Sequence, residues 1–169
     1  MSLDLNTLKD QIQSVLEAAN TTTAAVDLSS GIANSKRVLT IKKINPDLIP
    51  SDLTIMPLVT VYLDSKTVTP QTIAKNQATG KRMGELDFKI MGIVYNDNHS
   101  TDDEDPAQED IEHLMENIEQ IFRNNPTFSG TIALTSMPTE VQYFSGAFRE
   151  NEQTHIRGGL MTLNVKTFY

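Results

Sequence analysis

The densest group of side chains that could do chemistry is acidic and lies in residues 96–122, NDNHSTDDEDPAQEDIEHLMENIEQIF. This stretch holds ten carboxylates and no Lys or Arg. Carboxylate oxygens bind divalent cations, so one hypothesis is a metal-dependent hydrolase. Its ligands would be Asp97, His99, Asp102 and Asp103. The spacing does not match an EF-hand calcium loop, because Asp102 stands where that loop needs glycine.

A solvated turn that leads into a helix explains the same carboxylates without a metal. Asp105 is a suitable N-cap, Pro106 suits the first helical position, and Gln108 can cap in return. The following acids also favour the positive end of the helix dipole. We therefore interpret the stretch as a turn and a helix start.

Other catalytic signals are weak. The histidines, His99, His113 and His155, show no metal-ligand spacing and no HExxH pattern. Glu85 and Asp87 share one face of a predicted strand and could form an acid-base pair, but neighbouring charges on a solvated strand face are the simpler explanation. The chain has no cysteine, no phosphate-binding loop and no nucleophile elbow. We expect no enzyme activity, no metal and no cofactor.

Hydrophobic periodicity predicts the elements that position these residues. Apolar residues at helical spacing indicate amphipathic helices over 7–19, with Thr7 and Asp10 as a capping box, and from Pro106 to about Asn124. Alternating or β-branched runs indicate strands at 37–44, 58–63, 82–95, 130–137, 138–150 and 154–169. The paired glycines Gly158 and Gly159 suggest a bulge or a close backbone approach.

This order predicts an α+β fold, a mostly antiparallel β-sheet packed against two amphipathic helices. The polar residues 64–81 between two strands predict a long hairpin arm. We expect residues 1–169 to form a single domain, since the length suits one and no boundary is visible.

Charge is unevenly distributed along the chain. The net charge is −8, yet outside the acidic stretch twelve acids face fourteen bases. That pattern argues against a protein that coats DNA, because such binding neutralises phosphates with Lys and Arg. The sequence also shows no membrane-spanning run and no basic leader, so we expect neither a membrane span nor a signal peptide.

The order of elements resembles the tail terminator (tail completion) proteins of long-tailed bacteriophages. The matching stretches are LKDQIQSVLEAA, RVLTIKKI, MPLVTVYLD, GELDFKIMGIVYND, DIEHLMENIEQIF and HIRGGLMTLNVKTFY. The resemblance implies a non-catalytic virion protein of the tail or neck, assembled in the host cytoplasm. Its subunits would form a homohexameric ring that caps the tail tube and meets the head connector.

Such a ring needs contacts between subunits and a channel for DNA. We predict ring or partner contacts at the hairpin arm, carried by Lys66, Lys75, Lys81 and Arg82, and at strand edges. We also predict that an acidic loop faces the channel, where it would let DNA pass without binding. Its residues are Asp97, Asp102, Asp103 and Glu104. Alternatives are another phage neck protein, a tail-tube protein, or a non-viral adaptor that binds through the arm.

Overall fold

The computed structural model describes residues 4–32, 37–38, 40–44, 55–70, 82–96, 106–128, 133–147 and 155–168. The elements follow in the order α1 (Leu5–Ala19), β1 (Thr40–Lys42), β2 (Leu58–Pro70), β3 (Arg82–Asn96), α2 (Pro106–Asn124), β4 (Ala133–Ala147) and β5 (His155–Phe168). The predicted α+β class is therefore confirmed.

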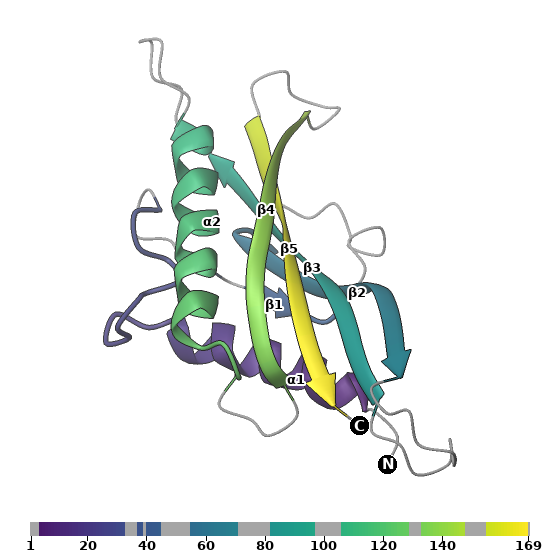
Figure 1. The fold of residues 1–169 in the computed structure, drawn as a ribbon. Coiled ribbons are helices and arrows are strands. Elements are labelled where there is room, and N and C mark those ends of the chain that lie inside the picture. The colour runs from purple at the N-terminus through teal and green to yellow at the C-terminus, as the bar shows by residue number, and fades with distance from the viewer. Residues whose placement is uncertain are drawn as a thin grey trace.

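The strands form one five-stranded sheet in the order β1-β2-β3-β5-β4. β1 pairs with β2 in parallel, and the other three pairings are antiparallel. β3 and β5 occupy the centre, and β4 forms one edge (Figure 1). On the other side β1 pairs only with Leu58, Val59 and Thr60 of β2. Among the described strands, none pairs with the outer side of β4, and none pairs with the outer side of β2 beyond Thr60.

The core lies between the helices and one face of the sheet. The predicted inner face of α2 is buried throughout, and α1 adds Leu8, Ile12 and Leu16 to the same cluster. The sheet contributes alternate residues of its central strands, as the period of two requires. These are Leu86, Phe88, Ile90 and Val94 of β3 with Met161, Leu163 and Val165 of β5.

The paired glycines make a close approach and no bulge, because the β3–β5 register runs through them unbroken. A Cβ built on Gly159 would lie 2.4 Å from Met115 Cγ, so α2 packs directly on the backbone of β5 there. On the opposite face of the sheet, a Cβ built on Gly158 would lie 2.2 Å from the ring of Phe144. Each glycine therefore makes room for one large side chain.

β4 is a single strand, although the sequence suggested two pieces divided before Pro138. Proline has no N–H to donate, so it removes a hydrogen bond from the ladder of a central strand. In the structure Pro138 pairs with Leu163, and the register shifts between Pro138 and Glu140. Edge strands tolerate proline at such irregularities because they pair on one side only. The sheet thus has five strands where the sequence predicted six.

Two local expectations near the N-terminus are also corrected. The cap of α1 is Asp4, whose carboxylate accepts hydrogen bonds from the backbone N–H groups of Asn6 (3.0 Å) and Thr7 (3.2 Å). Thr7 therefore lies inside the helix and does not begin it. β1 covers three residues, where a strand of eight was expected.

The predicted hairpin arm is more ordered than a loop. β2 and β3 stay paired from Leu58↔Ile93 to Pro70↔Arg82, with one irregularity between Leu63 and Ser65. Strand pairing therefore covers residues 64–70, which the sequence placed in the loop. Residues 71–81 lie outside the described part of the chain.

Candidate interaction surface

Among the described strands, the edge strand β4 has the most exposed large hydrophobic side chains. Among the described residues, four large hydrophobic side chains are exposed. Three lie on β4: Met137 is 59% exposed, Tyr143 is 45% exposed and Phe144 is 43% exposed. The fourth is Val68, on the far part of β2. Exposed apolar side chains on an unpaired edge favour association with another chain.

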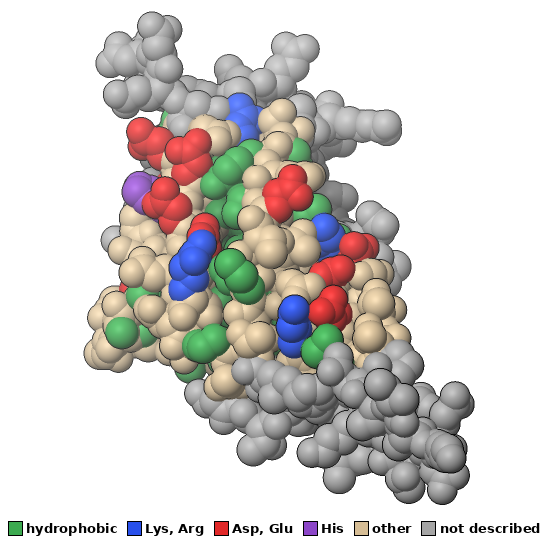
Figure 2. Space-filling model, in the orientation of Figure 1, with side chains coloured by type: hydrophobic (Ala, Val, Ile, Leu, Met, Phe, Trp, Pro, Cys, Tyr) green, Lys and Arg blue, Asp and Glu red, His purple; other side chains and the backbone are tan. Residues whose placement is uncertain are grey.

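Next to β4, the outer face of α2 is acidic. Tyr143 lies on the helix side of the sheet, and burial together with Glu112, Glu116 and Glu119 raises the pKa of its phenol. We call this surface, made by Glu112, Glu116, Glu119 and Tyr143, the α2–β4 seam. Figure 2 shows acidic side chains over α2 beside hydrophobic side chains in the middle of the view. The seam thus combines the partly exposed ring of Tyr143 with the negative charges of α2.

The top of the seam is hollowed. A pocket of about 300 Å³ is lined by Gln108, Tyr143, Phe144, Ser145 and Arg157. Phe144 lies over Gly158, so its ring is held against the backbone of β5 while part of it stays exposed.

The hairpin arm places a different set of groups at the other side of the sheet. Lys66 is exposed on β2, and the backbone of Arg82 pairs with Pro70. The structure thus brings two predicted contact residues onto one hairpin. Lys75 and Lys81 lie outside the described residues, so a role for them stays a prediction.

The predicted acidic loop is not described. Asp97, Asp102, Asp103 and Glu104 lie outside the described residues, and so does His99. Their position relative to a channel or a metal therefore stays a prediction. Within the described residues, no group of three or more His, Asp or Glu side chains could hold a metal ion. His113 is exposed, and its ring lies against Gly31.

The two carboxylates considered as an acid-base pair have separate partners on the sheet face away from the helices. Asp87 accepts hydrogen bonds from Ser65 Oγ (2.7 Å) and Asn164 Nδ2 (2.8 Å), and these bonds lower its pKa. Glu85 forms an ion pair with Lys166 at 3.2 Å. A carboxylate held ionised by donors is a poor proton shuttle near neutral pH. We assign both groups to cross-strand stabilisation.

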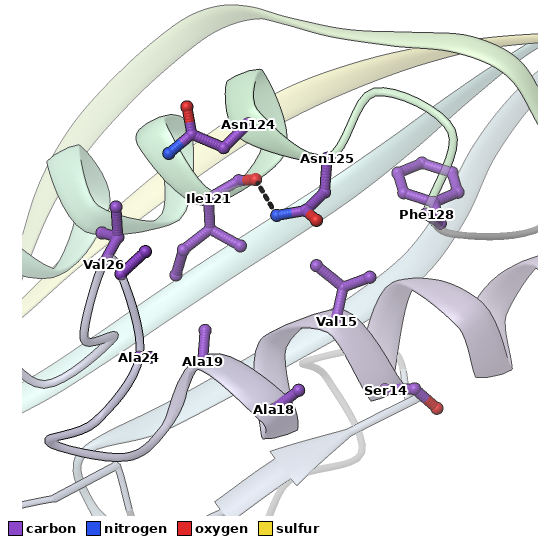
Figure 3. Close-up of a pocket in the computed structure, with 11 residues that line it drawn as sticks. Ser14, Val15, Ala18, Ala19, Ala24, Val26, Ile121, Asn124, Asn125 and Phe128 are labelled. Carbon is purple, nitrogen blue, oxygen red and sulfur yellow. Dashed lines mark hydrogen bonds between the residues drawn. The ribbon is translucent and has the colours of Figure 1, made fainter.

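A second pocket lies between the ends of the two helices. It has a volume of about 460 Å³ and is mostly apolar, with Val15, Val26, Ile121 and Phe128 among its lining residues (Figure 3). Asn125 Nδ2 donates to the Ile121 carbonyl oxygen at 2.9 Å. None of the described residues that line this pocket has an ionisable side chain, so they offer neither an acid nor a base.

The exposed residues of β4 were not predicted from the sequence. The run VQYF was correctly assigned to a strand, but nothing in its pattern shows that the strand lies at an edge. The available signal was Pro138, because proline inside a strand favours an edge position.

Comparison with known proteins gives a weak structural likeness. No protein-family model and no curated protein sequence matches the chain. One chain of the solved structure described as "Virion of native gene transfer agent (GTA) particle" matches with a TM-score of 0.46 and 10% identity, over 93% of this chain and 94% of that chain. A likeness at this level leaves the function to be argued from the chain's own residues. No helix in the described ranges is long and apolar enough to span a membrane.

Proposed function

We propose that the chain is a structural virion subunit that acts as a tail terminator, as its element order suggests. It forms a single domain that assembles into a homohexameric ring, caps the tail tube and meets the head connector. DNA passes through the ring without specific binding, and no reaction is catalysed.

The observation that carries this proposal is the pair of open edges on opposite sides of the sheet. β4 is unpaired on one side, and β2 beyond Thr60 is unpaired on the other, among the described strands. All the exposed large hydrophobic residues described lie on these two strands. Two different edges favour a heterologous contact, which repeats from copy to copy and closes a ring when the rotation permits.

The experiment is the mass of the purified protein at low and high concentration, by native mass spectrometry and light scattering. A species of six copies, or a shift toward six with concentration, is the expected result. A ring should then be mixed with tail tubes, whose ends it should cap and whose growth it should stop.

A protein that remains monomeric at every concentration would contradict a ring built by this chain alone. It would favour the adaptor hypothesis, in which the hairpin arm binds a different protein. A capture experiment with the wild-type chain and a Lys66→Glu variant would then test the arm directly.

A further inference from the structure

Two surfaces of this molecule are complementary but lie too far apart to meet within one copy. The first is the α2–β4 seam. The second is the described part of the hairpin arm on β2, which carries Lys66 and Val68, two residues apart in the sequence. Both residues lie on the helix side of the sheet, because they pair with Leu86 and Gly84 of β3.

The two surfaces have opposite charge. Between Ser65 and Pro70, the described part of the β2 arm holds one base, the exposed Lys66, and no acid. From Pro106 to Phe122 it holds five acids and no Lys or Arg. Of these acids, Glu112 and Glu116 are exposed on α2. Opposite charges steer association and fix its orientation.

Each surface also has an exposed hydrophobic group. Val68 on the arm is 39% exposed, and Tyr143 in the seam is 45% exposed. The outer edge of β4 further offers unpaired backbone groups, to which the free edge of β2 can add as a strand. Charge, apolar side chains and backbone therefore all fit the same pair of surfaces.

The sheet keeps the two surfaces apart. Val68 stands at the level of Thr167 of β5, and Tyr143 stands at the level of Gly159. Eight residues along a strand separate these levels by roughly 26 Å, and three strand spacings add roughly 14 Å across the sheet. Figure 1 shows the far ends of β2 and β3 at the lower right and α2 at the left. The surfaces can meet only between copies.

We infer that the hairpin arm of one copy docks on the α2–β4 seam of the next, with Val68 beside Tyr143 and Lys66 beside the α2 carboxylates. This inference rests on the proposed ring and names its contact. The occupant of the seam is thus a second copy of this chain.

A disulfide test suits this chain because it contains no cysteine. Val68→Cys and Tyr143→Cys variants are mixed in equal amounts and mildly oxidised. The expected product is a covalent dimer that needs both variants and is lost on reduction, since a disulfide requires Cα atoms within about 7 Å. A chain that carries both substitutions should form a covalent ladder of up to six copies.

The matched control replaces Tyr143→Cys by Glu17→Cys, an exposed position on α1. This mixture should give no dimer. A six-copy mass without the Val68–Tyr143 bond, or a bond to Met137→Cys on the same strand in its place, would overturn the docking inference and leave the ring intact. A monomeric mass without any bond would overturn both.

A charge exchange gives a second readout without cysteine. Lys66→Glu alone and Glu116→Lys alone should each raise the concentration for half assembly by roughly three- to tenfold, because both create like-charge contacts. The double variant should recover most of that loss. If the double variant assembled more weakly than either single variant, by the sum of the two losses, the contact between Lys66 and Glu116 would be contradicted.

Discussion

The centre of the sheet and its β4 edge are built from similar residues but differ in what covers them. Phe88 of β3 and Met115 of α2 are fully buried in the same core cluster, whereas Met137 and Tyr143 of β4 remain exposed. Among the described strands, pairing covers β3 and β5 on both sides, and β4 on one side only.

The difference separates two uses of hydrophobic surface. Apolar groups at the centre stabilise the subunit, because folding removes them from water. The exposed parts of the apolar groups on β4 stay in water in the folded subunit, and another chain that covers them would bury them. Substitutions in the two regions should therefore affect different measurements.

The largest effect on folding is expected at the centre. Phe88→Ala should lower the free energy of unfolding by roughly 3–5 kcal/mol, because it leaves a cavity under both helices. Met137→Ala at the edge should change it by less than about 0.5 kcal/mol. Urea denaturation of both variants at a concentration that keeps the protein monomeric measures this contrast. Equal losses would mean that β4 is covered within the subunit.

A moderate effect is expected where α2 meets the sheet. Gly159→Val should cost roughly 1–3 kcal/mol, because its side chain would overlap Met115. Combined with Met115→Ala, the loss should be smaller than the sum of the two single losses. Strictly additive losses in denaturation experiments would show that the two positions do not touch.

A smaller effect is expected from Asp87, on the sheet face away from the helices. Its pKa is lowered in the folded state, so it adds stability above the unfolded pKa of about 3.9, and that stability is lost as the pH falls through the folded value. Asp87→Asn should therefore weaken the dependence of unfolding on pH between about 5 and 2. If the variant lost stability at acid pH as steeply as the wild type, Ser65 and Asn164 would not stabilise the carboxylate.

The smallest effect on folding, and the largest on assembly, is expected at the edge. Met137→Lys together with Tyr143→Lys should leave the unfolding of the monomer within about 1 kcal/mol of wild type. The same change should raise the concentration for half assembly at least about tenfold, measured by sedimentation. Gln142→Lys, an exposed neighbour on β4, is the matched control. Normal assembly of the double variant would remove β4 from the contact.

Periodicity was enough to predict most of the fold. Helical spacing of apolar residues from Ile111 to Phe122 correctly predicted α2, and alternation from Leu86 to Val94 correctly predicted β3. Both patterns are local, because the buried face of one helix or strand sets the spacing of its apolar residues. The length of β4 was not predicted correctly. Proline breaks a central strand but is tolerated at an edge, and the sequence does not show which strands lie at an edge.

The candidate surface was less predictable than the fold. Lys66 and Arg82 were placed on the arm from local sequence, and both lie on the β2–β3 hairpin. Tyr143 and its acidic neighbours on α2 come together only through packing of β4 beside the helix, which no local pattern encodes. The role of Asp97, Asp102, Asp103 and Glu104 in a channel stays a prediction.

The most direct test of the account is amide hydrogen exchange of the wild-type chain across a range of concentrations. If β4 and the free part of β2 form the contact between copies, amides of residues 137–145 and 61–70 should become protected as the mass rises, while those of α1 stay constant. A rise in mass with unchanged exchange in β4 would contradict the claim that this edge joins the subunits.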